Sequence, residues 1–146
     1  MPLPKPEIGL IVHYSYRFRQ TTSTAMAGGK DRPCLIVSVN PDVDEPNAPG
    51  VLYLPITHSA PHNPGEALEI PPDARYAAGL DGYRQWVHVG EGNLDNWAYD
   101  VSRIPGRQGR YHYGFMPPRF FAQIQTRFAN LYAARRFDLM PRNEEE

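Results

Sequence analysis

Two positions in the sequence place side chains suited to phosphate chemistry beside apolar runs. Arg32 precedes the run Cys34–Val39, and Thr57 and His58 directly follow the run Val51–Ile56. A guanidinium binds phosphate oxygens through paired hydrogen bonds, a hydroxyl can donate another, and an imidazole exchanges protons near neutral pH. These side chains could together bind a phosphate and move a proton. The ordinary alternatives are a solvated strand end for Arg32, a turn hydroxyl for Thr57 and an exposed loop side chain for His58.

Other common catalytic signatures are missing from the sequence. It contains no phosphate-binding glycine loop, no dinucleotide-binding motif and no nucleophile elbow. His58 and His62 have a metal-binding spacing only on a helix, and Pro61 between them forbids one. Cys34 is the single cysteine, which excludes an internal disulfide and a cysteine-built zinc site. We therefore expect a packed thiol at Cys34, and neither a metal nor a cofactor.

The clearest strand pattern lies just before Arg32. Along residues 8–19 one set of alternating positions holds Ile8, Leu10, Val12, Tyr14, Tyr16 and Phe18, and the other holds Gly9, Ile11, His13, Ser15, Arg17 and Arg19. Alternation over twelve residues predicts a half-buried β-strand long enough to bend around a barrel, with the aromatic face in the core. The segment Gln20–Asp31 predicts a loop of a length that is usually functional.

The rest of the sequence predicts short strands and two helices. Expected strands are Cys34–Val39, Val51–Ile56, Ala67–Ile70, Gln85–Val89 and, more weakly, Trp97–Val101. A short helix is expected from Pro71 to Tyr76, and an amphipathic C-terminal helix over about 119–137. Strands followed by a terminal helix predict a mainly β (α+β) fold, a small antiparallel β-barrel with a helix packed on it.

Length and charge indicate one domain spanning 1–146 with basic ends. The net charge of −1 hides basic segments at 1–30 and 101–142 around an acidic middle, and 101–142 holds eight arginines against one acid. The basic ends say more about partners than the net charge does. No apolar run is long enough to span a membrane, and the first residues do not form a signal peptide. We expect a soluble, cytoplasmic protein.

In their order and spacing these segments resemble the MazF/PemK family of toxins from bacterial toxin–antitoxin pairs. The matching pieces are Ile8–Val12 (IGLIV), the segment GGKDRPCLIVS ending at Ser38, and Leu52–Ser59 (LYLPITHS). They are similar to the opening glycine–hydrophobic strand of the family, its RPxLIVS segment and its hydrophobic-PIT-S strand end. The resemblance spans roughly residues 8–60, with a looser similarity at Gln85–Asn93 and in the C-terminal helix.

The resemblance implies an SH3-like barrel that forms a homodimer and cleaves single-stranded RNA without a metal. The family uses the ribose 2′-OH as nucleophile, which leaves a 2′,3′-cyclic phosphate and a 5′-OH. It also implies a growth inhibitor that serves plasmid maintenance and is held in check by an antitoxin covering the RNA groove. Carried over by position, the arginine of the RP motif is Arg32 and the hydroxyl of the PIT motif is Thr57.

The proton-transfer groups are less clearly marked in the sequence. His58 is the first candidate and His13 the second, since each could titrate near neutral pH. A later family segment resembling V-R-x-D-Q corresponds to Val87–Asn93, where His88 stands in place of the arginine and Glu91 lies one residue out of register. A slip of one residue turns a side chain to the opposite face, unless Gly90 marks a bulge.

RNA contacts are expected from residues around these segments. The candidates are Arg17, Arg19, Lys30 and Ser59, with the loop at residues 20–31 gating the groove. Tyr111, Tyr113 and Phe115 could stack on bases or pack in an interface. The departure around Glu91 keeps a second function open, a non-catalytic barrel module that binds a protein or nucleic acid, for example a gyrase-inhibitor-like toxin.

Overall fold

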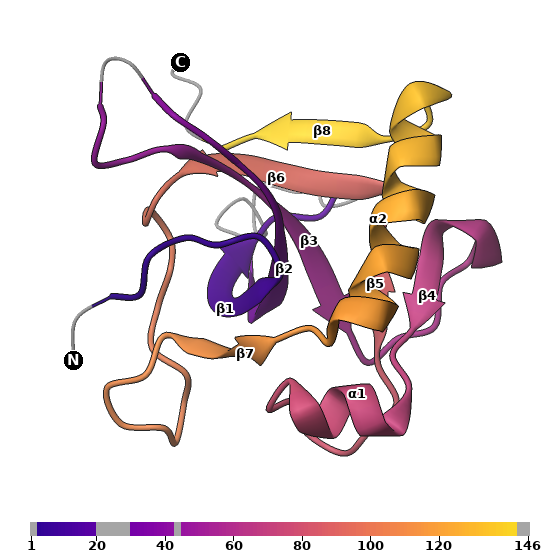
Figure 1. Ribbon diagram of the computed structural model, residues 1–146, viewed down its shortest axis with the longest axis horizontal. Helices are drawn as coiled ribbons and strands as arrows, with labels where there is room; N and C mark the ends of the chain where they lie inside the picture. Colours follow the sequence, from indigo (N-terminus) through magenta and orange to yellow (C-terminus); the bar gives the residue numbers. More distant parts are fainter. Residues whose placement is uncertain (1–2, 20–29, 43–44, 143–146) are drawn as a thin grey trace.

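The computed structural model describes residues 3–19, 30–42 and 45–142 (Figure 1). Its elements in chain order are β1 Leu10–Tyr16, β2 Lys30–Asn40, β3 Gly50–Thr57, the 3-10 helix η2 Pro64–Glu66, β4 Ala67–Glu69, α1 Pro72–Ala77, β5 Trp86–His88, β6 Glu91–Asn96, β7 His112–Phe115, α2 Pro118–Ala133 and β8 Asp138–Pro141. Most of the predicted loop at 20–31 lies outside the described residues. Of the described helices, none is long and apolar enough to cross a membrane.

The strands form one mostly antiparallel sheet in the order β4-β5-β3-β2-β1-β7. On the edge away from β2, strand β3 has two partners. Its residues Gly50–Tyr53 pair with β6, and Ile56–Thr57 pair with β5. Among the described strands, only the ladder between β6 and β8 is parallel. The predicted barrel closure is wrong, because within the described strands no backbone ladder joins β1 to β6 and the sheet stays open. The architecture is a small α+β fold.

Both faces of the first three strands are buried, which corrects the prediction of a half-buried β1. Leu10, Val12, Tyr14 and Tyr16 belong to one apolar cluster, as the alternation predicts. Ile11, on the opposite face, is fully buried in a second cluster with helix α2. Three α2 side chains at helical spacing, Phe120, Ile124 and Leu131, form the buried stripe of that helix. The helix therefore covers the face that alternation alone would leave in solvent.

The other face closes on β6 through side chains, which we call the β1–β6 seam. Its members are Tyr14, Tyr16 and Arg17 on the first strand segment and Glu91, Asn93 and Asp95 on β6. The Tyr14 hydroxyl donates to Asp95 over 2.9 Å, and the Tyr16 hydroxyl donates to Glu91 over 3.1 Å. The Asn93 amide accepts from the Arg17 N–H at 2.9 Å and donates to the Arg17 carbonyl at 3.0 Å. Side chains thus take the place of the missing backbone ladder.

Arg142, just after β8, places a buried positive charge at the middle of this seam. Its side chain is 6% exposed and donates to the Ser15 carbonyl at 2.5 Å, to Asn93 at 3.1 Å and to Asp100 at 3.2 Å. The nearby Asp95 is 2% exposed, and burial raises the pKa of its carboxyl to about 6. The negative charge of Asp95 inside the seam is therefore compensated by hydrogen bonds and by the nearby Arg142.

Two predicted boundaries are wrong for physical reasons. Helix α2 ends at Ala133 and not near 137, because Arg135 adopts a left-handed conformation with φ of 60°. The Arg136 N–H then bonds the Leu131 carbonyl at 2.8 Å, a helix-ending turn that glycine usually marks. The weakly predicted strand at Trp97–Val101 forms a turn that ends in one isolated bridge. The strand in this part of the chain is β6, which ends just before the turn.

Replacing Asn93 with alanine is expected to lower the free energy of unfolding by about 2–4 kcal/mol. The substitution removes the two hydrogen bonds that the fully buried Asn93 side chain makes with the Arg17 backbone. Urea unfolding of the purified protein measures the change. The control is Asn130→Ala at an exposed position on α2, which should change stability by less than about 0.5 kcal/mol. Equal effects of the two substitutions would contradict the role of the seam.

The raised pKa of Asp95 predicts a particular dependence of stability on pH. Between the ordinary value of 3.8 and the folded value of about 6, the folded protein binds more protons at Asp95 than the unfolded chain does. The contribution of Asp95 to stability is therefore present below pH 4 and is lost as pH rises to 6. Asp95→Asn cannot titrate, so its stability relative to the wild type should improve across this window. Parallel stability curves for the two proteins from pH 4 to 7 would rule this out.

Candidate active site

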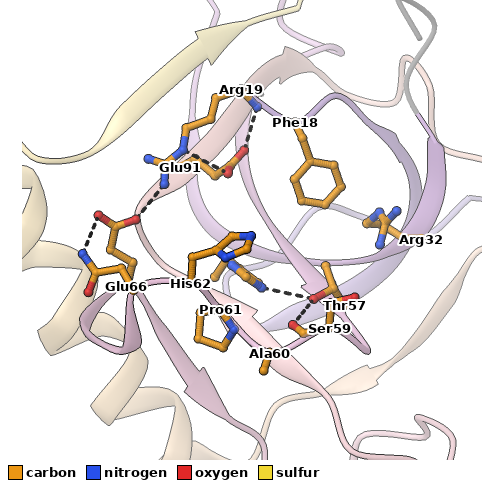
Figure 2. Close-up of a pocket in the computed structure, with 12 residues that line it drawn as sticks. Phe18, Arg19, Arg32, Thr57, Ser59, Ala60, Pro61, His62, Glu66 and Glu91 are labelled. Atoms are coloured by element: carbon orange, nitrogen blue, oxygen red, sulfur yellow. Dashed lines mark hydrogen bonds and ion pairs between the residues drawn. The ribbon is translucent and has the colours of Figure 1, made fainter. Parts of the chain in front are cut away.

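A pocket of about 300 Å³ opens beside the end of β3 (Figure 2). Its lining residues are Phe18, Arg19, Arg32, Thr57, Ser59, Ala60, Pro61, His62, Asn63, Glu66, His88 and Glu91. They come from the segment after β1, from β2, from the end of β3, from the loop into η2, and from β5 and β6. The sheet curl and the seam bring these separate segments to one place.

Arg32 supplies a positive charge that has no carboxylate partner in the described part of the chain. It lies on β2, opposite Tyr14 of β1. Its guanidinium carbon is 4.7 Å from the centre of the Phe18 ring, and its buried Nε has no hydrogen-bond partner among the described residues. Burial lowers the pKa of Arg32, because the charged form loses water. An anion bound in the pocket would compensate this charge.

Thr57 and His88 form a hydrogen-bonded pair beside this charge. The ladder between β3 and β5 brings the two residues together, and Thr57 Oγ1 lies 3.1 Å from His88 Nε2. The Thr57 hydroxyl donates its proton to the Ser59 carbonyl over 3.0 Å. His88 Nε2 is then the donor to Thr57, which leaves Nδ1 of a neutral ring as the acceptor.

The surroundings of His88 favour that neutral ring. Burial lowers the pKa of the His88 imidazole, and the positive charges of Arg19 and Arg32 lower it further. A hydrogen bond to the Ser59 backbone acts in the opposite direction. At neutral pH the ring is therefore unprotonated and able to accept a proton.

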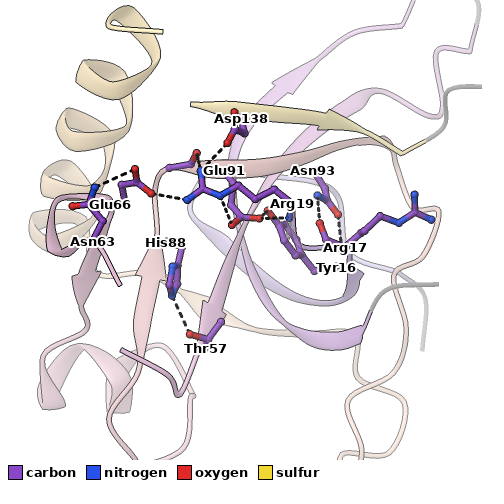
Figure 3. Close-up of polar contacts among 11 residues, drawn as sticks. Tyr16, Arg17, Arg19, Thr57, Asn63, Glu66, His88, Glu91, Asn93 and Asp138 are labelled. Carbon is purple, nitrogen blue, oxygen red and sulfur yellow. Dashed lines mark hydrogen bonds and ion pairs between the residues drawn. The ribbon is translucent and has the colours of Figure 1, made fainter. Parts of the chain in front are cut away.

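The opposite wall holds carboxylates that are tied to Arg19 (Figure 3). Arg19 pairs with Glu66 at 2.6 Å, with Asp138 at 2.7 Å and with Glu91 at 3.4 Å. Glu91 also accepts from the Tyr16 hydroxyl and from the Arg19 N–H. Burial raises the pKa of Glu91, although the bonds to Arg19 and Tyr16 oppose that rise. Arg19 thus fixes this wall and is itself fully engaged by carboxylates.

The chain changes pairing partner between His88 and Glu91, so both reach the pocket. In a continuous strand, positions three residues apart would face opposite sides. Here β5 ends at His88, and β6 begins at Glu91 against a different half of β3. A Cβ on Gly90 would lie 2.9 Å from the Glu66 carboxylate, so a larger residue at this crossing point would require the Glu66 side chain to shift. The register question raised by the sequence is answered by this break.

The structure brings together six of the residues singled out by the sequence. Arg19, Arg32, Thr57, Ser59, His88 and Glu91 all line the pocket. Of the candidates for proton transfer, His58 and His13 lie elsewhere. His58 lies just past the end of β3, where it is exposed and bonds Asp81 at 2.9 Å. His13 is buried and bonds the Tyr113 hydroxyl at 2.9 Å.

Two expected RNA contacts also lie outside the pocket lining. Lys30 is exposed at the start of β2, and Figure 3 shows the Arg17 side chain extending away from Thr57 and His88. Conversely, the pocket includes Phe18, His62 and Glu66, which the sequence did not assign to a site. The prolines around His62, at 61 and 64, are the one local sign of a stiff loop there.

Fold and site together define a small α+β domain with a pocket that holds the Arg32 guanidinium together with imidazole and carboxylate groups. No protein-family model matches the chain, and a search of curated proteins finds no significant match. Among the described residues, no group of three or more His, Cys, Asp or Glu side chains is placed to hold a metal ion.

The pKa of His88, measured by NMR titration of the imidazole signals, is expected to fall below the ordinary value of 6.5. Arg32→Gln removes one of the positive charges that disfavour the protonated ring, so the pKa of His88 should rise in this variant. A His88 pKa above 6.5 in the wild type, or no rise in Arg32→Gln, would contradict the electrostatic account of the pocket.

Proposed function

We propose that this protein is a metal-independent endoribonuclease of the MazF/PemK toxin type. The observation that carries the proposal is the Arg32 guanidinium, which has no carboxylate partner among the described residues and lines one pocket with Thr57 and His88. An anion-binding charge next to a proton acceptor is what cleavage of a phosphodiester by a neighbouring hydroxyl requires. The sequence segments that resemble the family supply two of these three residues.

The reaction divides the roles among the pocket residues. Arg32 binds the non-bridging oxygens of the scissile phosphate and stabilises the charge of the phosphorane. His88 accepts the proton of the attacking ribose 2′-OH, which its lowered pKa permits at neutral pH. Thr57 holds the His88 ring through the contact between Oγ1 and Nε2. The attack forms the 2′,3′-cyclic phosphate and releases the 5′-oxygen of the next nucleotide.

The pocket has the size and lining for one nucleotide of a single strand. Its volume of about 300 Å³ lies at the small end of ligand pockets, which reach about 1,000 Å³. Phe18 lines it as an aromatic surface beside Arg32, and aromatic rings bind unpaired bases by stacking. A paired duplex presents no free base face to such a ring, so the lining favours a single strand.

The proposal includes the biological role and the partners implied by the family. A growth-inhibiting toxin would be paired with an antitoxin that covers this pocket, and two copies of the chain would form a homodimer. The family's SH3-like barrel would correspond to the curled sheet, with the β1–β6 seam in place of a ladder. These parts of the proposal rest on the resemblance of the sequence.

Cleavage of a long single-stranded RNA by the purified protein in EDTA tests the proposal. We expect discrete fragments with 2′,3′-cyclic phosphate and 5′-OH ends. Arg32→Ala should lower the cleavage rate about 10²–10³-fold, because the stabilising charge at the phosphorane is lost. Arg84→Ala removes an exposed arginine that pairs with Glu69 outside the pocket, so its rate should equal that of the wild type.

Intact RNA at high protein concentration would overturn the endonuclease proposal. If the protein then binds RNA or another macromolecule through the same pocket, the alternative of a non-catalytic binding module holds. The mutual engagement of Arg19 with Glu66 and Glu91 is the structural feature that favours this alternative, because it leaves fewer groups available for catalysis. Binding measured with Arg32→Ala separates the two outcomes, since a binding module loses affinity in that variant without ever cutting RNA.

A further inference from the structure

His62 is a pocket residue to which the roles above give no task. It lies in the loop that joins β3 to η2, and its imidazole lines the same pocket as Arg32, Thr57 and His88. Figure 2 shows the His62 ring within the pocket, between Glu66 and the Thr57–Ser59 segment. The side chain is exposed, so it can exchange a proton with solvent between turnovers.

The loop holds His62 through bonds on both sides of it. On one side the Thr57 hydroxyl bonds the Ser59 carbonyl at 3.0 Å, which ties the loop to the end of β3. On the other side the Asn63 side chain accepts from the Gly65 N–H at 3.0 Å and caps η2. Pro61 and Pro64 restrict the backbone further. His62 is therefore presented by a short, constrained segment.

The two pocket histidines come from different elements of the fold. His88 is part of β5 and is bonded to Thr57, whereas His62 is on the loop between β3 and η2. The charged and titratable groups that line the pocket with them are Arg19, Arg32, Glu66 and Glu91. Of these, Arg19 pairs with both Glu66 and Glu91. The imidazole of His62 is left as the accessible group that can deliver a proton.

We propose that His62 is the general acid of the cleavage reaction, an assignment that rests on the proposed function. His88 takes the proton of the 2′-OH as the bond between O2′ and phosphorus forms. The protonated His62 gives its proton to O5′ as the bond between phosphorus and O5′ breaks. The products are the 2′,3′-cyclic phosphate and a 5′-OH, and the two histidines return to their starting states by exchange with water. Atoms, electrons and protons balance without a further reactant.

His62→Gln tests the assignment, with His58→Gln as the matched control. The control removes a second loop histidine, which bonds Asp81 and does not line the pocket. A short RNA with a single cleavage site, taken from the mapped fragments, serves as substrate. His62→Gln should lower kcat/KM about 10²–10⁴-fold, the usual contribution of an acid or base. His58→Gln should keep the wild-type rate.

A substrate with sulfur in place of O5′ identifies the acid step itself. A thiolate leaves without protonation, so His62→Gln should cleave this substrate within about threefold of the wild-type rate. Arg32→Ala should remain slow on it, because the phosphorane still needs its counter-charge. Thermal unfolding of each variant confirms that the fold is retained.

Each alternative result overturns a different statement. A His62→Gln variant as active as the wild type removes His62 from the reaction and leaves the endonuclease proposal intact. A variant that is equally slow on both substrates shows that His62 positions the RNA and is no acid. A wild-type protein that cleaves neither substrate refutes the proposed function and therefore also the assignment of His62 as the acid.

Discussion

The need to satisfy polar side chains inside the sheet shapes the whole molecule. Strand β6 buries Glu91, Asn93 and Asp95 on one face, and buried polar groups without partners are costly. The partners are hydroxyl and backbone groups of β1 and the residue after it, together with Arg142 from beyond β8. The sheet must therefore curl until β1 faces β6, although no backbone ladder joins them in the described chain. This curl also brings the segment after β1 over the pocket.

The seam and the pocket are consequently parts of one polar network. Glu91 accepts from Tyr16 in the seam and also lines the pocket, and Arg19 extends the network to Glu66 and to β8 through Asp138. Because Arg19 satisfies these carboxylates, their negative charge is compensated locally. The charge of Arg32, across the pocket, stays available to a ligand. This arrangement leaves the Arg32 charge in the pocket without a carboxylate partner among the described residues.

The parts of the structure that local patterns determine could be predicted from the sequence. The alternation in residues 8–19 identified the core face of β1, and apolar runs beside polar residues located Arg32 and Thr57 at the pocket. Strand β6 could not be found in this way, because its buried face is polar and its sequence EGNLDN reads as a loop. Its stability comes from partners that are far away in the sequence, which no local pattern reveals.

The choice of the histidine beside Thr57 depends on the same kind of distant pairing. His58 directly follows Thr57 and is the first candidate in the sequence, but it lies beyond the end of β3 and bonds the exposed Asp81. The ladder between β3 and β5 instead places His88, thirty-one residues later, within 3.1 Å of the hydroxyl. Since β5 ends there and the chain crosses at Gly90, Glu91 reaches the same pocket from β6. Register between strands, which sequence specifies only through the assembled sheet, therefore decides which groups can act on a bound phosphate.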